Sequence, residues 1–365
     1  MKLNEVKFDC IHFRGDIPCA PNKKRGQVCP TCTEYKAIKT KILIIKLGAL
    51  GDVIRSTPLI TRFRKKYPNA HITWITHSPA ILPADKIDKI YKFDFNAVYH
   101  ITHQQYDVAI NLDKEIEACA LLSDVQAKEK FGFIWKNNHI DIANEKAEHK
   151  LMTGLFDTLS IQNKKNYLEE IFEICGFDFQ QEPYLLNYNK DLAEKWTVLR
   201  EKAGTKIIVG LNTGCGKRWS TRLWPSDYWL ELIVRLQKAN YFPVLLGGED
   251  ENEMNNLYRD KTGAYYPGTF SLEEFIALTS NCDIIVTAVS MMMHIAIGLK
   301  KPMLLFNNIF NKHEFELYGK GIIVEPHTGC DCYYGNTCIR SKNCMQDISV
   351  EKVFSTIGEL SIKLK

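Results

Sequence analysis

The segment KILIIKLGALGDVIRSTP, residues 41–58, constrains the fold more than any other part of the chain. Its first seven residues form a continuous β-branched and leucine run, which is typical of a parallel strand covered on both faces. Gly48 and Gly51 allow a tight turn in which the backbone can come close to a ligand. Asp52 then opens a predicted helix that extends to about Lys66. The segment therefore predicts an α/β protein with a carboxylate at the carboxyl end of its first strand.

Strand and helix patterns alternate along the rest of the chain. Further strands are predicted at residues 71–76, 106–111, 130–134, 206–212, 242–248, 283–288 and 302–306, and helices at 164–175, 227–238, 271–280 and 291–299. A polar stretch at 186–204 suits a connector, and 365 residues suit two domains better than one core. We therefore expect two Rossmann-like, doubly wound domains facing a shared cleft. The expected parts are a cysteine-rich segment at 1–40, the two domains at 41–190 and 204–328, a cysteine-rich finger at 329–346 and a C-terminal helix at 347–365.

Composition and charge narrow the functional class. The chain is 45% hydrophobic and 25% charged, which is typical of a soluble globular protein. No apolar run approaches the roughly 20 residues that span a bilayer, and the first residues lack the apolar core of a signal peptide. We therefore expect a cytoplasmic protein with no transmembrane segment. Peripheral contact with a membrane remains compatible with this composition. The basic cluster at residues 62–66 fits a solvated helix end better than a patch for an anionic acceptor.

The twelve cysteines fall into two groups of four and four scattered residues. Cys10, Cys19, Cys29 and Cys32 precede the first strand, Cys330, Cys332, Cys338 and Cys344 precede the last helix, and Cys119, Cys175, Cys215 and Cys282 are scattered. Disulfides rarely persist in the cytoplasm, whereas thiolates bind soft metals. We therefore expect two tetrathiolate sites that hold structural zinc or iron, with redox-labile surface cysteines as the disfavoured alternative. Because these segments are not rich in Lys and Arg, we expect no nucleic-acid partner.

Ligand-type residues gather where the second-half strands are expected to end. Residues 212–225, NTGCGKRWSTRLWP, combine two glycines with the cations Lys217, Arg218 and Arg222, which can hold a diphosphate without a Walker loop. The run GGEDE that ends at Glu251 supplies a carboxylate that can accept hydrogen bonds from ribose hydroxyls. These residue types predict a nucleotide site.

A third group follows the strand predicted at 283–288. Ser290 lies at a strand-to-helix turn and His294 in the first turn of the helix, where free N–H groups stabilise an anion. Each fragment also has a purely structural explanation. Asp52 can cap a helix, Lys217 can be a surface residue, and His294 can be a satisfied core histidine. Their common placement at strand ends favours the nucleotide site.

From Lys41 to Lys365 the chain resembles glycosyltransferase family nine, the ADP-heptose:lipopolysaccharide heptosyltransferases and their relatives. The resemblance rests on the ALGDV turn, the segment GCGKRWSTRLWP, the GG-acid run, and the closing VSMMMH and GLKKP stretches. It implies a GT-B fold in which the C-terminal helix crosses back onto the first domain. It also implies inverting transfer of a sugar, with ADP-heptose as the favoured nucleotide-sugar donor, to a hydroxyl of a lipopolysaccharide core or protein acceptor.

The resemblance also implies roles for individual residues. Asp52 would be the general base, with Gly48, Gly51 and Arg55 on the acceptor side. The donor residues that it implies are Thr213, Gly214, Gly216, Lys217, Arg218, Glu251, Thr287, Ser290, Met291 and His294. No DxD motif for a metal-bound diphosphate is evident, so we expect no catalytic divalent metal.

Two departures from the family pattern affect the donor and the acceptor. Val289 stands where the family has an acid and Met291 where it has a glycine, which alters the donor contacts of this turn. The C-terminal cysteine group resembles that of the bacterial autotransporter heptosyltransferases, which modify protein hydroxyls. The polar and aromatic loop at 307–321 is expected near the nucleotide base. The alternative function is a catalytically weakened relative that acts as a metal-stabilised interaction or assembly protein.

Overall fold

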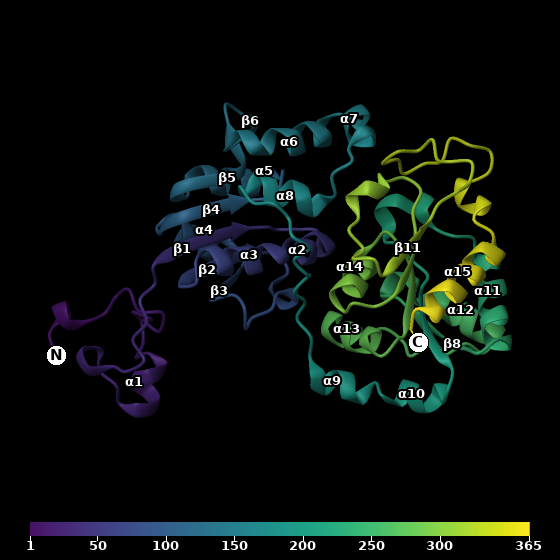
Figure 1. Ribbon diagram of the computed structural model, residues 1–365, viewed down its shortest axis with the longest axis horizontal. Helices are drawn as coiled ribbons and strands as arrows, with labels where there is room; N and C mark the ends of the chain where they lie inside the picture. The colour runs from purple at the N-terminus through teal and green to yellow at the C-terminus, as the bar shows by residue number, and fades with distance from the viewer. Residues whose placement is uncertain (365) are drawn as a thin grey trace.

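The computed structural model describes residues 1–364, except for the side chains of residues 217–219. Two α/β halves stand next to each other, and a small N-terminal segment projects from the outer side of the first half (Figure 1). The connector contains α9 (Lys190–Lys195) and α10 (Val198–Ala203), which run along one edge of the molecule between the halves. The expected architecture of two doubly wound halves is confirmed.

The first half is built on a six-stranded sheet in the order β3-β2-β1-β4-β5-β6. The strands are β1 (Thr40–Ile45), β2 (Ala70–Thr76), β3 (Lys89–Lys92), β4 (Gln105–Asn111), β5 (Gln126–Lys136) and β6 (His139–Ile142). All neighbours pair in parallel except β5 and β6. The helices are α2 (Leu50–Ser56), α3 (Pro58–Lys66), α4 (Phe95–Thr102), α5 (Ile116–Asp124), α6 (Glu148–Leu155), α7 (Asp157–Gln162) and α8 (Tyr167–Ile174). Residues 42–45 of β1 are fully buried, as the apolar run predicts for a central strand.

The helix after the first strand differs from the prediction. It begins at Leu50, two residues before Asp52, and it is interrupted at Thr57, so α2 and α3 replace one continuous helix. Pro58 is the first residue of α3, a position where the missing N–H of proline costs no helical hydrogen bond. The hydroxyl of Thr57 donates to the carbonyl of Ile54 at 2.7 Å and thereby satisfies one acceptor at the end of α2.

The second half is built on a five-stranded parallel sheet in the order β11-β10-β9-β7-β8. The strands are β7 (Ile207–Asn212), β8 (Tyr241–Leu246), β9 (Ile284–Ala288), β10 (Met303–Phe306) and β11 (Gly321–Val324). The helices are α11 (Ser226–Lys238), α12 (Asn252–Thr262), α13 (Leu272–Ser280), α14 (Met291–Gly298) and α15 (Val350–Ile362). Each strand and helix expected from the sequence of this half is present.

The C-terminal helix does not make the contact that the resemblance implies. α15 packs against α11, β9 and β10, all in the second half. Its Val353, Ile357 and Leu360 are buried in the core of that half, and Glu351 pairs with Arg235 of α11. The expected crossing to the first domain is therefore wrong for this chain, because the apolar face of the helix is already covered by its own half (Figure 1).

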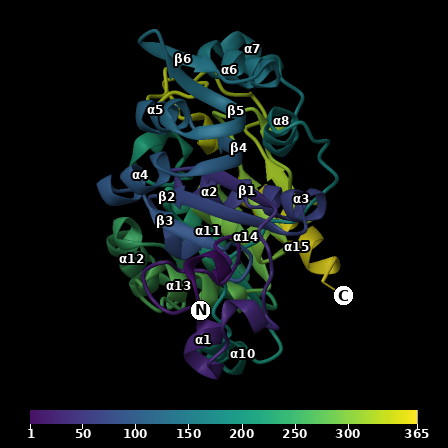
Figure 2. The same ribbon diagram turned by 90° about the vertical axis from the view of Figure 1, so that its left-hand side faces the viewer.

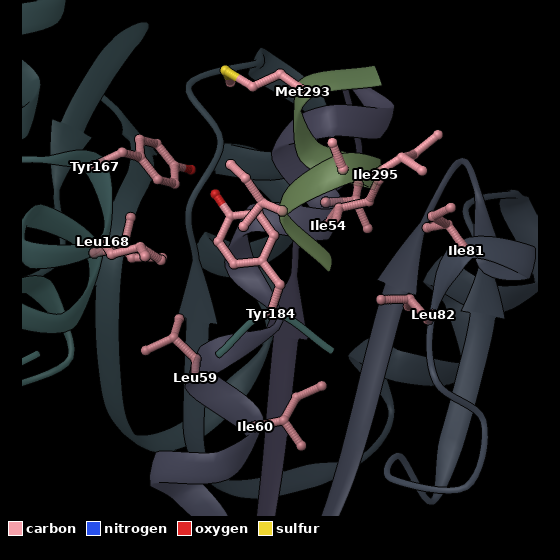
Figure 3. Packing of buried hydrophobic residues seen from close by; sticks show 14 of the residues in the cluster. Ile54, Leu59, Ile60, Ile81, Leu82, Tyr167, Leu168, Tyr184, Met293 and Ile295 are labelled. Atoms are coloured by element: carbon pink, nitrogen blue, oxygen red, sulfur yellow. The ribbon is translucent and has the colours of Figure 1, made fainter. Parts of the chain in front are cut away.

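The two halves share a hydrophobic core where α2 meets α14. Tyr184, from the segment that follows α8, is buried between residues of α2 and α3 and residues of α14 such as Met293 and Ile295 (Figure 3). Such a shared apolar core favours a fixed relative position of the halves. No helix within residues 1–364 is both long enough and apolar enough to cross a membrane.

Loops of the second half also bind α7 of the first half. The hydroxyl of Tyr333 lies 2.7 Å from that of Ser160. The side-chain amide of Asn311, itself buried, donates to the carbonyls of Ser160 and Asn163 at 2.8 and 2.7 Å. The halves are thus connected by hydrogen bonds at the edge opposite the connector (Figure 1).

The N-terminal segment has almost no core. It contains α1 (Ala20–Arg25) and two single 3-10 turns, and it lies apart from both sheets (Figures 1 and 2). Among residues 1–39 only Pro21 is buried. Two backbone hydrogen bonds join the beginning of this segment to its end: the N–H of Ile11 donates to the carbonyl of Lys36, and the N–H of Ile38 donates to the carbonyl of Asp9. A segment of this size without a core usually needs a covalent or metal cross-link.

Candidate active site

A cavity of about 720 Å³ lies between the two halves at the carboxyl ends of their strands. Its volume is in the range of sites that hold a whole small-molecule ligand. The sequence-predicted site residues that line it are Gly51, Asp52, Arg55, Gly214, Gly216, Glu251, Ser290, Met291 and His294. The structure therefore brings residues predicted on the acceptor side and on the donor side to one cavity.

The other predicted site residues either do not line the cavity or have side chains that the structure does not describe. Gly48 accepts a hydrogen bond from Lys46 through its carbonyl. Thr213 is buried, and its hydroxyl donates to Asn255 at 2.7 Å. Thr287 is buried and bonded to Asn212 and Ser290. Lys217 and Arg218 begin a 3-10 helix at Lys217–Arg222, but their side chains lie outside the described part of the chain.

Asp52, in the first turn of α2, is surrounded by positive charge. One carboxylate oxygen lies 2.8 Å from the guanidinium of Arg55, and the Nζ of Lys46 lies 4.0 Å from the other. Burial alone would raise the pKa of Asp52, but the charges of Arg55 and Lys46 outweigh it and hold that pKa below its ordinary value. The carboxylate is therefore ionised at neutral pH. Its side chain remains 34% exposed, so a ligand in the cavity can reach it.

The ion pair beneath Asp52 was missed in the sequence. Lys46 is 3% exposed, and its ammonium donates to the carboxylate of Asp113 and, at 2.7 Å, to the carbonyl of Gly48. Although burial opposes the charge, Tyr167, Asp113 and Asp52 raise the pKa of Lys46 to about 12. A lysine at the end of an apolar strand and an aspartate just after another, Asp113 after β4, are the signals that could have revealed this pair.

His294 of the second half packs against the turn that contains Gly51 and Asp52. Its ring stacks on Tyr184, with centroids 6.1 Å apart, and an added Cβ on Gly51 would lie 2.4 Å from its Cδ2. Only glycine at position 51 allows this approach of α2 to α14. Burial and the nearby Arg55 lower the pKa of His294 to about 3, so its imidazole is neutral. Its buried Nδ1 has no hydrogen-bond partner among the described residues.

Glu251 is enclosed by two glycine-containing turns. Its carboxylate accepts a hydrogen bond from the backbone N–H of Gly248 at 2.9 Å. A Cβ on Gly214 would lie 1.9 Å from Glu251 Oε1, and one on Gly247 would lie 2.6 Å from Glu251 Cβ. The absence of side chains at these glycines therefore leaves space for the carboxylate. The apolar side chains of Phe270, Leu272 and Phe275 line the same cavity.

The turn before α14 presents its helix start to the cavity. Ser290 is the N-cap residue, and its hydroxyl lies 3.2 Å from that of Thr287. The free N–H groups of such a helix start attract anions. Arg222 donates to the carbonyls of Val289 and Cys215 and so joins this turn to the glycine turn of β7. Val289, which replaces the family's acid, lines the cavity without supplying a charge.

The cavity also contains a carboxylate and a phenol that the sequence did not single out. Glu314, from the 3-10 turn Lys312–Glu314, and Tyr334, from the second cysteine group, both belong to the second half. Both residues lie in long loops, and the sequence of a loop has no periodic pattern from which its position relative to the sheet could be predicted. Phe310, Glu314 and Phe315 of the loop at 307–321 line the cavity. The place of this loop near a nucleotide base stays a prediction.

The two cysteine groups are each gathered in space. Cys10, Cys19, Cys29 and Cys32 line one cavity of about 300 Å³, together with His12. In the second group, the backbone N–H of Cys332 donates to the Sγ of Cys330 at 3.4 Å, and Cys330, Cys332 and Cys338 belong to one cluster with Ile309 and Phe310. All of these cysteines are free thiols. Four thiols suit zinc or iron, although no three His, Cys, Asp or Glu side chains within residues 1–364 are already arranged as a metal-binding group.

Solved structures share this architecture. A family 9 glycosyltransferase from Veillonella parvula superposes with a TM-score of 0.68 at 18% identity, covering 89% of this chain and 98% of that one. TibC, an iron-containing dodecameric heptosyltransferase from enterotoxigenic E. coli solved with ADP-D-beta-D-heptose, gives a TM-score of 0.56 at 13% identity, covering 94% and 82%. The fold is that of the GT-B glycosyltransferases.

Sequence comparison identifies the family. Residues 97–322 match the model of glycosyltransferase family 9 (heptosyltransferase). Lipooligosaccharide heptosyltransferase 2 of Haemophilus influenzae is 21% identical over 289 residues, which cover 72% of this chain and 82% of that protein. The chain belongs to glycosyltransferase family 9, and it is a glycosyltransferase, as its motifs predicted.

Proposed function

We propose that the protein transfers heptose from ADP-heptose to a hydroxyl of a lipopolysaccharide or protein acceptor, with inversion at the anomeric carbon. The main support for this proposal is that one cavity is lined by Asp52 from the first half and by Glu251 and the start of α14 from the second half. A base from the first half and anion-binding groups from the second are what a direct displacement at a sugar diphosphate requires.

In the proposed reaction, the acceptor hydroxyl attacks the anomeric carbon and gives its proton to Asp52. The bond between the anomeric carbon and the diphosphate oxygen breaks at the same time, and the diphosphate leaves with the electron pair. The backbone N–H groups at the start of α14 and in the turn containing Gly214 and Gly216 stabilise the charge that develops on it. Lys217 and Arg218 follow directly in the chain and are proposed to add positive charge.

The nucleotide assignment rests on residues of the second half that line the same cavity. Glu251 is proposed to accept hydrogen bonds from the ribose hydroxyls. Phe270, Leu272 and Phe275 supply an apolar wall for the base. TibC, a structural neighbour, was solved with ADP-D-beta-D-heptose, which favours adenine as the base.

A thermal-shift panel of nucleotides tests the donor. We expect ADP to raise the melting temperature more than UDP or GDP, because a ligand that binds only the folded state stabilises it by about 2.7 kcal/mol at 100 times its Kd. The Asp52→Asn variant should show the same nucleotide order, since Asp52 is assigned to the acceptor side. Stabilisation by UDP or GDP but not by ADP would refute the heptose donor.

The acceptor is tested in cells. Mass spectrometry of lipopolysaccharide and of proteins from cells with and without the active protein should show loss of one heptose from one acceptor class. Cells that express the Asp52→Asn variant should resemble cells without the protein. Unchanged masses in both acceptor classes would contradict the proposed transfer.

We also propose that the two cysteine groups each hold a structural zinc or iron ion. Cys10, Cys19, Cys29 and Cys32 would hold one ion, and Cys330, Cys332, Cys338 and Cys344 the other. Such an ion supplies folding free energy to a segment without a core, as in residues 1–39. Neither group contributes a cysteine to the wall of the main cavity, so we propose that both ions are structural.

A further inference from the structure

The loop of the second cysteine group forms part of the active-site wall. Cys332 is buried against Ile309 and Phe310, and two residues later Tyr334 lines the main cavity. The backbone N–H of Tyr334 donates to the carbonyl of Ile309 at 3.0 Å, and its ring packs edge-on against Phe310 with centroids 4.9 Å apart. Tyr334 has φ +47°, a conformation that non-glycine residues rarely adopt, so the loop holds this side chain in a specific place.

Tyr334 is joined to the carboxylate of Glu314. The phenol oxygen lies 3.3 and 3.2 Å from the two carboxylate oxygens. The phenol O–H donates and the carboxylate accepts in this contact. An ionised carboxylate has about four lone-pair positions, and one donor leaves others available to a ligand.

Glu314 lies close to the first half, since the ring of the preceding residue, His313, is 3.4 Å from the Nζ of Lys164. Glu314 acts electrostatically on Arg55, the partner of Asp52, and on Lys114 of the first half. Glu251, in contrast, is bonded to Gly248 at the proposed ribose position. A sugar whose anomeric carbon is within reach of an acceptor activated by Asp52 would therefore lie beside Glu314.

Glu314 and Tyr334 belong to the same half as the residues assigned to the nucleotide diphosphate. We propose that Glu314 accepts a hydrogen bond from a hydroxyl of the transferred sugar, with Tyr334 as its positioning residue, and that this contact selects the sugar. The proposal rests on the proposed function, since it assumes a nucleotide-sugar donor. Val289 leaves the turn before α14 without a carboxylate, whereas Glu314 gives the second half a carboxylate in the wall of the same cavity.

Comparison of a nucleotide with its sugar conjugate tests this proposal. Glu314→Gln keeps the shape of the side chain but removes its charge, and a lost hydrogen bond to a charged group weakens binding about 10-fold or more. We therefore expect the Kd for ADP-heptose to rise about 10-fold while the Kd for ADP stays the same. Tyr334→Phe should change the ratio of the two Kd values in the same direction but by less, because the carboxylate remains.

Tyr333→Phe is the matched control. It removes the hydroxyl of the adjacent tyrosine, which bonds to Ser160 instead of Glu314, and it should leave the ratio of the two Kd values unchanged. Melting temperatures of all variants report whether they are folded. Equal weakening of ADP and ADP-heptose, no change in either, or a change only in the KM for acceptor would each overturn the proposal.

The same measurements separate this proposal from the proposed function. If wild-type protein binds UDP or GDP in place of ADP, the donor assignment fails. The comparison is then made between that nucleotide and its sugar conjugate. If Glu314→Gln weakens the affinity for the sugar conjugate but not for the nucleotide alone, the proposed role of Glu314 is supported with either nucleotide.

Discussion

The carboxylate of Asp52 and the guanidinium of Arg55 lie 2.8 Å apart, one helical turn from each other on α2. Arg55 also makes a cation–π contact, because its guanidinium lies 3.4 Å from the centroid of the Tyr167 ring. The pair is therefore part of a rigid wall of the cavity. Arg55 keeps Asp52 ionised and also makes it a weaker base, so removal of either side chain has a distinct effect on the reaction.

Replacement of Asp52 by Asn tests its proposed function as the general base. Asn keeps the size of the side chain but cannot accept the proton, so transfer should fall by at least about 100-fold. The melting temperature and the affinity for ADP should stay close to those of the wild type. Unchanged transfer in Asp52→Asn would restrict this residue to a structural function in α2.

Replacement of Arg55 by Met should change the pH dependence of transfer. Because the positive charge of Arg55 lowers the pKa of Asp52, its removal raises that pKa. The acidic limb of the kcat/KM profile should therefore move to higher pH. Arg64→Met is the control, since Arg64 pairs with Asp88 away from the cavity. An acidic limb that stays in place or moves to lower pH would show that Asp52 is not the titrating group.

Replacement of Gly214 by Ala should weaken nucleotide binding. The added Cβ would lie 1.9 Å from Glu251 Oε1, so the carboxylate must leave its position. We expect the Kd for ADP to rise about 10-fold, the loss of one hydrogen bond to a charged group. Gly358→Ala is the matched control, because a Cβ there meets no atom within 4 Å and alanine favours the helix α15. Equal ADP affinity in the two variants would argue against Glu251 as a nucleotide ligand.

Metal analysis of purified protein should find about two zinc or iron atoms per chain, one for each group of four thiols. The double replacement of Cys330 and Cys332 by Ser should remove one of them and lower the stability of the second half, because metal binding contributes to folding free energy. Cys175→Ala removes a buried thiol outside both groups and should leave the metal content unchanged. Metal-free protein of full stability would contradict both sites.

The sequence predicted the strands in which consecutive residues are buried. β1, β4, β7 and β9 are apolar runs, and glycines follow β1 and β7, so their positions and the cavity at their ends were foreseeable. The edge strands β3, β6 and β11 were not predicted, since each is only four residues long and mostly half-buried. Short edge strands have too weak an alternation to be distinguished from loops.

The site was predictable where a residue follows a strand directly. Asp52, Glu251 and His294 were found in this way, because strand ends meet at one edge of a sheet. Glu314 and Tyr334 were not found, since they reach the cavity through loops whose positions depend on packing around Ile309 and Phe310. The placement of α15 depends in the same way on tertiary contacts, here with α11.

The hydrogen bonds from Asn311 and Tyr333 to α7 have a kinetic consequence. Separation of the halves at that edge would break three hydrogen bonds, two of them made by a buried amide. The connector, with α9 packed on α13, restrains the opposite edge. Opening of the cleft must also separate the apolar core that α2 and α14 share, so it is opposed at both edges and between them. The exchange of spent nucleotide for new donor would then be slowed by contacts remote from the bond that is broken.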